Sequence, residues 1–491
     1  MSGQLIFIIV YFVITVAIGL LSGRKTKSAA AFTGTALSVF AIVCASTGEW
    51  LGGTATTGVS EYGFLYGLSG WWYTIANGIG VMFLGLLFAK FFRSLNEGTV
   101  PGIIEKFFGL RAREVSSIIL TIVMLAVGLS QMIAAGKLGE SLLGIPFFWS
   151  CIAFAIIFIV YTLAGGMNAV ASTNVLHLFV MYFGVILAVI IAVSRLGGLD
   201  AFRTGIAAVE TQVLAETGEA TSFWNMFTIG GSKVSSWIIA SLLGACTAQA
   251  GLQPVLAAKD AKQARKACII TAFVAAPFGF FTAVLGMAAR VLYSRGELLA
   301  GMDVSAAAKS ALPELMMSMH PLAGGLVLAA ILAAVLSTIS PIILAAGTML
   351  TRDIYQRKLH PEATDTQVLK MSRITTAVSG IICCAGAIFL WKASTVLELV
   401  YAAYSLRGAL FVVVLLGMYW KKASSKGACW SMICTAVVAV AWVAFKLIAG
   451  HYPISIGSFA ITETYAAVVV AFVCTIVFSL VFPKKDELSA N

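Results

Sequence analysis

The sequence predicts an all-α polytopic membrane protein, because its composition, its long apolar runs and the placement of its charges agree. The 491 residues are 60% hydrophobic and only 11% charged, with a mean hydropathy of +0.97. A soluble domain carries about 25% charged residues. Apolar runs near the roughly 20 residues that cross a bilayer as a helix recur along the chain. We therefore expect about thirteen transmembrane helices in one integral-membrane domain over residues 1–491. The predicted spans cover residues 4–22, 35–58, 68–92, 114–136, 146–163, 170–194, 225–248, 267–292, 322–350, 372–391, 395–419, 427–449 and 464–482.

The net charge of +11 is explained by membrane topology and not by a nucleic-acid partner. When the predicted spans alternate sides from the first one, most of the 32 lysines and arginines fall on the same side. Cytoplasmic loops of membrane proteins carry such an excess. We therefore expect a multi-pass protein of the plasma membrane, with its amino terminus outside and its carboxyl terminus in the cytoplasm.

Two spans are interrupted by glycine and polar residues. The second contains STGEWLGG at residues 46–53, and the seventh is interrupted between Gly244 and Pro254. Irregular backbone at membrane depth persists only where protein surrounds it or a cavity adjoins it. Two interrupted spans in matching positions predict a transporter built from two inverted five-helix repeats, about 35–194 and 225–419. The flanking helices would then be 4–22, 427–449 and 464–482.

Two adjacent hydroxyls, Ser337 and Thr338, lie well inside the ninth predicted span. Oxygen ligands of this kind suit a small hard cation. Serine and threonine also commonly bond to carbonyls of their own membrane helix. The residues alone leave both interpretations open.

Glu49 is the residue of the second span that costs the most free energy to place inside a membrane. A carboxylate in mid-membrane costs about 2.5–3.5 kcal/mol, so it requires a partner or a cavity. Glu49 either faces a ligand cavity or forms an interhelical ion pair with Arg407 of the eleventh span. Arg407 itself is a clamp for a substrate carboxylate, a gating partner or a side chain that reaches the interface. Trp50 offers an aromatic wall for a cationic or flat solute, and His177 is a structural residue or a proton relay.

Three segments together resemble the sodium:solute symporter family. They are the glycine-rich second span, YTLAGGMNAVASTNVLH at residues 161–177, and AAVLSTISPIILAAGTMLTRDIY at residues 333–355. The resemblance implies a sodium site between the second and ninth spans. Ser337 and Thr338 would supply hydroxyls, and three carbonyls would complete about five oxygens. The resemblance assigns those carbonyls to Ala334, Ala45 and Ile42.

Within this family the second span is most similar to that of choline transporters. Trp50 falls on a tryptophan that packs against the choline ammonium there. Ser130 or Gln131 and Ala248 stand near the positions of the other tryptophans, so choline itself is not expected. The candidate substrate-binding residues are Glu49, Trp50, Gln131, Gln249 and Arg407. Asn174 replaces an aspartate of the family pattern, which argues against a second cation site.

The resemblance implies a sodium-coupled symporter that takes up a small polar organic solute by alternating access. A proton-coupled transporter, using Glu49 or His177, is the alternative mechanism. A membrane sensor with the same fold is the alternative from another class. The sequence contains no HEXXH, CXXC-pair, Walker or nucleophile-elbow motif, so an enzyme is not expected.

Overall fold

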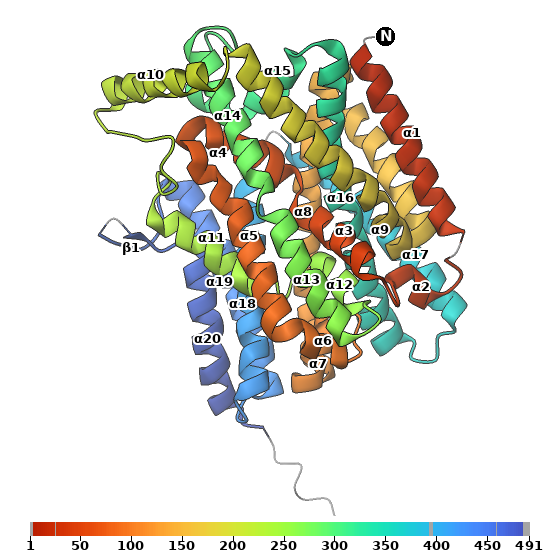
Figure 1. The fold of residues 1–491 in the computed structure, drawn as a ribbon. Helices are drawn as coiled ribbons and strands as arrows, with labels where there is room; N and C mark the ends of the chain where they lie inside the picture. The colour runs from red at the N-terminus through yellow and green to blue at the C-terminus, as the bar shows by residue number, and fades with distance from the viewer. Residues whose placement is uncertain (1–2, 25, 392–395, 458, 485–491) are drawn as a thin grey trace, which may run out of the picture.

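The structure is a computed structural model that describes residues 3–484, except residues 25, 392–395 and 458 (Figure 1). The predicted span 395–419 therefore begins at a residue outside the described part. The protein is an all-α polytopic membrane protein, as predicted. The one sheet among the described residues is a short hairpin of β1 (Ser455–Ile456) and β2 (Phe459–Ala460).

The first half of the chain forms α1 (Gly3–Gly23), α2 (Ala29–Thr33), α3 (Val39–Trp50), the π-helical η1 (Thr54–Gly58), α4 (Val59–Tyr66), the 3-10 turn η2 (Gly67–Trp71), α5 (Trp72–Phe83), the π-helical η3 (Leu84–Phe88), α6 (Ala89–Ser94), α7 (Val100–Phe108), α8 (Leu110–Leu143), α9 (Phe147–Arg195) and α10 (Leu199–Thr217). The second half forms α11 (Gly231–Gly244), α12 (Gln249–Leu256), α13 (Ala261–Ala275), α14 (Phe278–Ser294), α15 (Val304–Met317), α16 (Pro321–Met349), the π-helical η4 (Leu350–Leu359), α17 (Asp365–Leu390), α18 (Val396–Tyr419), α19 (Ser425–Ala449) and α20 (Glu463–Val481).

The predicted number of thirteen spans is not confirmed. In the described residues, ten helical stretches are long and apolar enough to cross a membrane, and Val39–Trp50 and Ala403–Tyr419 are shorter apolar helices. Part of the difference lies in α9, which is one continuous stretch of 49 residues but consists of two helices that meet at a kink at Gly166 (φ 53°, ψ −134°). These two helices correspond to the predicted spans 146–163 and 170–194. A side chain at Gly166 would also collide with the carbonyl oxygen of Phe32, so the bend requires glycine.

Both predicted interruptions are present. The helix of the second span stops at Trp50 and resumes at Thr54, and that of the seventh stops at Gly244 and resumes at Gln249. The second span is longer than predicted, because helical structure continues through α4 to Tyr66 and not to residue 58. Thr56 and Ser60, two polar residues of this longer span, are fully buried inside the protein, where polar groups are tolerated at membrane depth.

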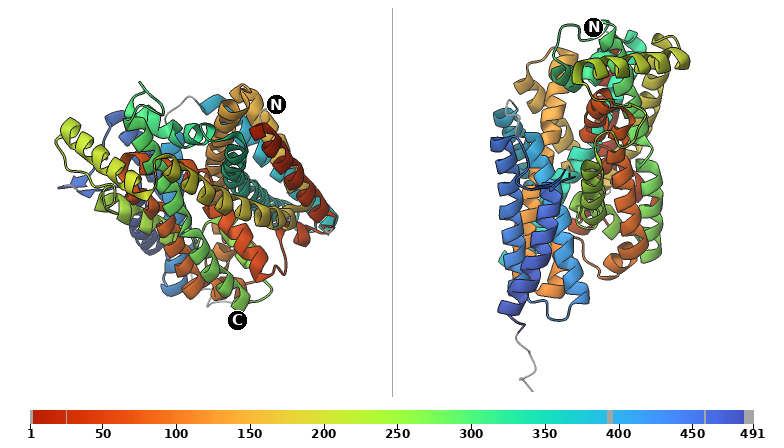
Figure 2. Two further views of the ribbon diagram at one scale, coloured as in Figure 1. Left: turned by 45° about the horizontal axis from the view of Figure 1, so that its top comes forward. Right: turned by 90° about the vertical axis from the view of Figure 1, so that its left-hand side faces the viewer.

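α16 is the central helix of the bundle. Of the most apolar 18 residues in the stretch between Ala323 and Leu359, 94% are buried inside the protein. Such an all-round apolar helix belongs in the core, and α16 packs against α9, α8, α1, α17 and α3. α18, α19 and α20 pack on one another along one side of this bundle (Figure 2).

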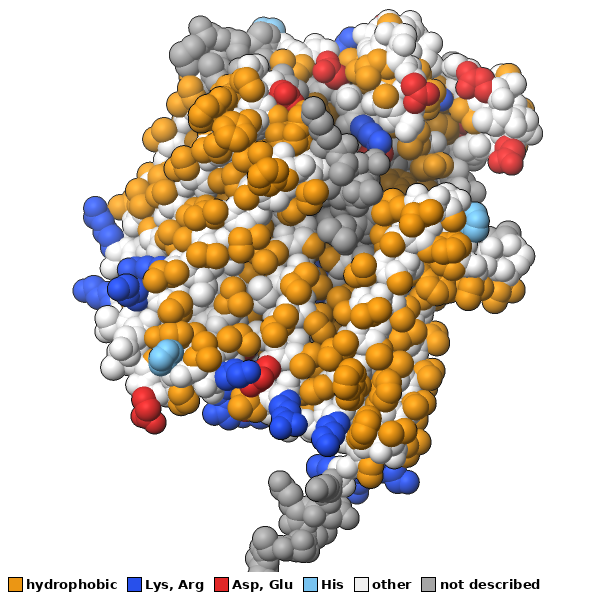
Figure 3. All heavy atoms as spheres, turned by 180° about the vertical axis from the view of Figure 1, so that it is seen from behind, with side chains coloured by type: hydrophobic (Ala, Val, Ile, Leu, Met, Phe, Trp, Pro, Cys, Tyr) orange, Lys and Arg blue, Asp and Glu red, His pale blue; other side chains and the backbone are white. Residues whose placement is uncertain are grey.

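The outer surface is suited to a lipid bilayer. Large apolar side chains such as Ile122, Phe183 and Val437 are exposed on it, and hydrophobic atoms cover most of the face in Figure 3. Lysine and arginine side chains gather toward the lower end of that view, which also holds the end of α20. We call this the basic end.

Because α4 and α14 approach each other closely, we expect the stability of the protein to fall when a side chain is added at their contact. A Cβ at Gly286 of α14 would lie 2.0 Å from the carbonyl oxygen of Ser60, and one at Gly63 of α4 would lie 2.3 Å from that of Ala283. We therefore expect Gly286→Val to lower the free energy of unfolding by roughly 1–3 kcal/mol, because the two backbones must separate.

The thermal unfolding midpoint of detergent-purified protein measures this effect. Gly231→Ala is the matched control, because a Cβ at Gly231 would meet nothing within 4 Å. Equal midpoints for the two variants would contradict the close packing of α4 on α14.

Candidate functional site

A cluster of oxygens joins α16 to the end of α3. The Ser337 hydroxyl donates to the carbonyl oxygens of Gly48 (3.1 Å) and Ala334 (2.9 Å). The Thr338 hydroxyl donates to the same two carbonyls, at 2.7 Å and 3.1 Å. An added Cβ at Gly52 would lie 2.5 Å from the Thr338 hydroxyl oxygen, so the contact depends on a glycine. Four oxygens from two helices therefore meet in the core.

Ala45 reaches this cluster through Asn174 of α9. The Asn174 amide nitrogen donates to the carbonyl oxygen of Ala45 at 3.3 Å and to that of Ser337 at 3.2 Å. The place of the Ile42 carbonyl in the sodium site stays a prediction. The sequence analysis did not assign Gly48 to the sodium site, although Gly48 follows Ala45 by three residues and so shares its face.

Glu49 and Arg407 lie together in a small cavity, part of which is open to solvent. Its wall comes from α3, α5, α11, α18 and α20. The lining residues are Glu49, Trp50, Tyr73, Asn77, Lys233, Ser236, Trp237, Ala240, Ser241, Tyr404, Ser405, Arg407, Glu463 and Thr464. Lys233 and Glu463 belong to the first turns of α11 and α20, and α20 ends at the basic end. The cavity therefore leads from mid-membrane toward the opposite end.

The Arg407 guanidinium lies between an aromatic pair and a carboxylate. Its carbon is 5.2 Å from the centre of the Trp50 ring and 4.6 Å from that of Tyr404. Its NH1 atom is 3.4 Å from Oε1 of Glu49, and the two side chains are only 5% and 4% exposed. Both hypotheses for Glu49 thus describe part of its surroundings, because it pairs with Arg407 and also lines the cavity.

The structure places the two candidate glutamines outside the cavity wall. Oε1 of Gln131 accepts a hydrogen bond from the backbone nitrogen of Gly53 at 2.9 Å, at the interruption after α3. Oε1 of Gln249 accepts from the backbone nitrogen of Val100 at 2.7 Å, and its amide nitrogen donates to the Gly98 carbonyl at 3.2 Å. Both side chains hold irregular backbone, which a sequence pattern alone does not distinguish from ligand binding.

His177 is fully buried in α9, and its Nδ1 contacts the hydroxyl of Tyr11. Within the described part of the chain, its Nε2 has no hydrogen-bond partner. His177 does not line the cavity that contains Glu49.

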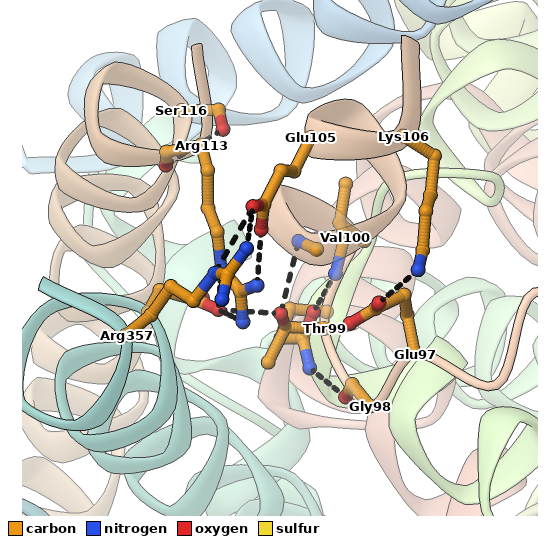
Figure 4. A network of polar contacts seen from close by, with 12 residues as sticks. Glu97, Gly98, Thr99, Val100, Glu105, Lys106, Arg113, Ser116 and Arg357 are labelled. Atoms are coloured by element: carbon orange, nitrogen blue, oxygen red, sulfur yellow. Dashed lines mark hydrogen bonds and ion pairs between the residues drawn. The ribbon is translucent and has the colours of Figure 1, made fainter. Parts of the chain in front are cut away.

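A polar network closes the basic end of the bundle, and sequence reasoning missed it (Figure 4). Arg113 of α8 donates from Nε to Asp353 of η4 at 2.8 Å and pairs with Glu105 of α7 at 2.5 Å. Glu105 also pairs with Arg357 at 2.6 Å, and the Thr99 hydroxyl donates to Asp353 at 2.8 Å. These contacts tie η4, which continues α16, to α7 and α8.

Comparisons with known proteins identify the family of this chain. The profile of the sodium:solute symporter family matches residues 32–435. The chain belongs to the sodium:solute symporter family. It is a membrane transporter and not an enzyme, as the sequence predicts.

Two relatives of the same family span nearly the whole chain. A sodium/glucose cotransporter of Vibrio parahaemolyticus is 26% identical over 94% of this chain and 88% of its own length. The osmoregulated proline transporter OpuE of Bacillus subtilis (strain 168) is 27% identical over 88% of this chain and 87% of its own length.

A solved structure shows the same fold. It is a sodium-coupled sialic acid symporter in a substrate-bound, outward-open state, which superposes with a TM-score of 0.80 and covers 99% of both chains at 19% identity. The family membership and this fold confirm the predicted resemblance.

Arg113 and Arg357 both pair with Glu105, yet the network at the basic end predicts that they contribute very differently to the stability of the protein. The Arg113 side chain is 9% exposed and also faces the fully buried Asp353, whereas Arg357 is 56% exposed. We expect Arg113→Gln to cost about 3–5 kcal/mol of unfolding free energy, because it leaves a buried carboxylate unpaired. The matched Arg357→Gln should cost at most about 1 kcal/mol.

Denaturant unfolding of the purified variants measures both costs. Adding Asp353→Asn to Arg113→Gln should restore part of the loss, since the unpaired charge is then removed. The interpretation would be wrong if Arg357→Gln were the more damaging of the two single changes.

Proposed function

We propose that this symporter couples the entry of sodium to the uptake of a small polar organic solute by alternating access. The observation that carries the proposal is the oxygen cluster of Ser337, Thr338, Ala334 and Gly48. The Ala45 carbonyl is linked to it through the Asn174 amide. Hydroxyl and carbonyl oxygens are the ligands that a hard cation prefers. The relatives described as sodium/glucose and proline transporters support a solute of this class.

The molecule would lie in the plasma membrane with the basic end in the cytoplasm. The excess of lysine and arginine at that end supports this orientation. The amino terminus would then be outside and the carboxyl terminus inside. In this orientation the cavity leads outward and the network around Asp353 closes the inner side. The structure thus corresponds to the half of an alternating-access cycle in which the solute enters from outside.

We expect alanine at both Ser337 and Thr338 to raise the sodium concentration for half-maximal uptake by roughly tenfold or more, because two cation ligands are lost. The measurement is solute uptake by proteoliposomes at increasing sodium. Ser379→Ala is the matched control, because that buried hydroxyl donates to the Thr375 carbonyl of its own helix at 2.8 Å.

An unchanged sodium dependence in the double variant would refute the site. Replacing sodium by potassium under an imposed pH gradient separates the two mechanisms. Uptake that follows the pH gradient and ignores sodium would favour proton coupling through Glu49 or His177.

We further expect one sodium ion per transport cycle. Asn174 offers a neutral amide, and its nitrogen already donates to the carbonyls of Ala45 and Ser337. Sodium-dependent uptake should therefore follow a hyperbola with a Hill coefficient of about one, since a value near two requires coupled sites. Reversal-potential measurements on proteoliposomes give the ratio directly, and two sodium ions per solute would show that another group replaces the missing carboxylate.

A further inference from the structure

The cavity holds an ion pair that is poorly satisfied. Good charge-assisted hydrogen bonds have N–O distances of about 2.7–2.9 Å, whereas Glu49 and Arg407 are 3.4 Å apart. Among the described residues, Oε2 of Glu49 and Nε of Arg407 have no hydrogen-bond partner, although both atoms are buried. Buried charges with spare hydrogen-bonding capacity are costly and are commonly found at functional sites. The pair therefore leaves room for a better partner on each side.

The charges around the cavity are balanced. Glu49 and Glu463 are acidic, and Lys233 and Arg407 are basic, so the formal charges of these four lining residues sum to zero. An anionic solute on Arg407 would separate it from Glu49 and leave that carboxylate unpaired, and a cationic solute on Glu49 would do the same to Arg407. Leaving one member of a buried pair alone is strongly unfavourable. A solute with both charges avoids this cost.

We propose that the transported solute is a zwitterion of the amino-acid type, whose ammonium group binds Glu49 while its carboxylate binds Arg407. This inference rests on the proposed transport function and names its substrate class. Binding replaces the Glu49–Arg407 contact with two new ion pairs. The unpartnered Oε2 of Glu49 accepts an N–H of the ammonium, and the guanidinium presents its fork of donors to the carboxylate.

The surroundings of the two charges suit such a solute. Trp50 and Tyr404 hold the guanidinium by cation–π contacts, which fixes it before the solute arrives. Tyr73 and Trp237 meet edge to face at 5.9 Å and form an aromatic wall beside the charges. The remaining part of an amino acid can lie against this wall. A sugar would contact these rings too, but it would leave the ion pair as it is.

The first experiment compares ligands that differ only in charge, by thermal unfolding of the full-length purified protein. The probes are a pool of neutral amino acids, the corresponding amino-acid amides, the corresponding deaminated carboxylic acids, glycine betaine and glucose. Each is tested in sodium chloride and in potassium chloride. A ligand that binds the folded state raises the unfolding midpoint.

We expect the amino-acid pool to raise the midpoint and the singly charged analogues to have little effect. Glycine betaine should act more weakly, because a quaternary nitrogen has no N–H for Glu49. Stabilisation by glucose or by a singly charged analogue as large as that by the amino acids would overturn the inference. So would the absence of any effect of amino acids in either salt.

The second experiment tests the two residues with the best amino acid from the pool. Glu49→Gln and Arg407→Gln should each weaken binding by at least about 30-fold, the usual loss when one partner of a buried charged contact is removed. The double variant Glu49→Gln, Arg407→Gln leaves no unpaired charge and should fold, yet it should also lose binding. An unchanged Kd in the double variant would refute the assignment.

The matched control neutralises an ion pair away from the cavity, Glu114 with Lys358, which lie 2.7 Å apart near the basic end. Glu114→Gln with Lys358→Gln should leave the Kd unchanged. The two salts separate the two proposals. Equal amino-acid binding in sodium and potassium, with uptake that ignores sodium, would contradict sodium coupling and leave the zwitterion standing. Sodium-driven uptake of a sugar with no amino-acid binding would do the reverse.

Discussion

The interruption of α3 after Trp50 is the constraint on which the site depends. Inside a bilayer every backbone polar group needs a partner, because water is absent and an unsatisfied group costs several kcal/mol. The groups freed at this interruption are satisfied by other helices. Gln131 of α8 accepts from the nitrogen of Gly53, and Ser337 and Thr338 of α16 donate to the carbonyl of Gly48. The same contacts that make the interruption tolerable therefore assemble the oxygen cluster.

The second interruption, between α11 and α12, lies against the first. The Ser46 hydroxyl of α3 donates to the carbonyl of Gly251 at 3.0 Å. A Cβ at Gly251 would lie 3.1 Å from Oε2 of Glu49, so the absence of a side chain leaves that carboxylate its space. At the other side, the Thr247 hydroxyl donates to the backbone carbonyl of Arg407. The two interruptions thus position both charged residues of the cavity.

The sequence identifies most of the residues that cost free energy inside a membrane, but few of the groups that these residues contact in the fold. A mid-membrane carboxylate, a mid-membrane arginine and paired hydroxyls each cost free energy in lipid, so Glu49, Arg407, Ser337 and Thr338 stand out in an apolar sequence. The contact of the Gly48 carbonyl with Ser337 and Thr338 depends on how α16 meets an irregular segment, and propensity does not determine that contact. Gln249 shows the same limit, because an amide that binds a solute and one that holds a loop look alike in sequence.

The sequence analysis did not predict the network at the basic end, for a related reason. Charged residues near helix ends are usually solvated, and nothing local in the sequence distinguishes Asp353, which is fully buried, from the more exposed Arg357. Their difference comes from the packing of α7 and α8 against η4. The fold class follows from composition and long apolar runs, whereas the closure of the basic end follows from tertiary contacts between segments more than 200 residues apart.

Neighbouring residues connect the proposed ion and solute sites. The carbonyl of Gly48 belongs to the oxygen cluster, and the next side chain, Glu49, belongs to the cavity. An ion that draws the Gly48 carbonyl toward α16 also fixes the backbone that carries Glu49. By linkage, a solute that fixes Glu49 must favour the ion to the same degree. α16 extends the connection to the basic end, because the helix that carries Ser337 and Thr338 continues into η4, where Asp353 pairs with Arg113. Opening the basic end requires breaking that buried pair, so in the proposed cycle a displacement of α16 would tie release at this end to the occupancy of the oxygen cluster.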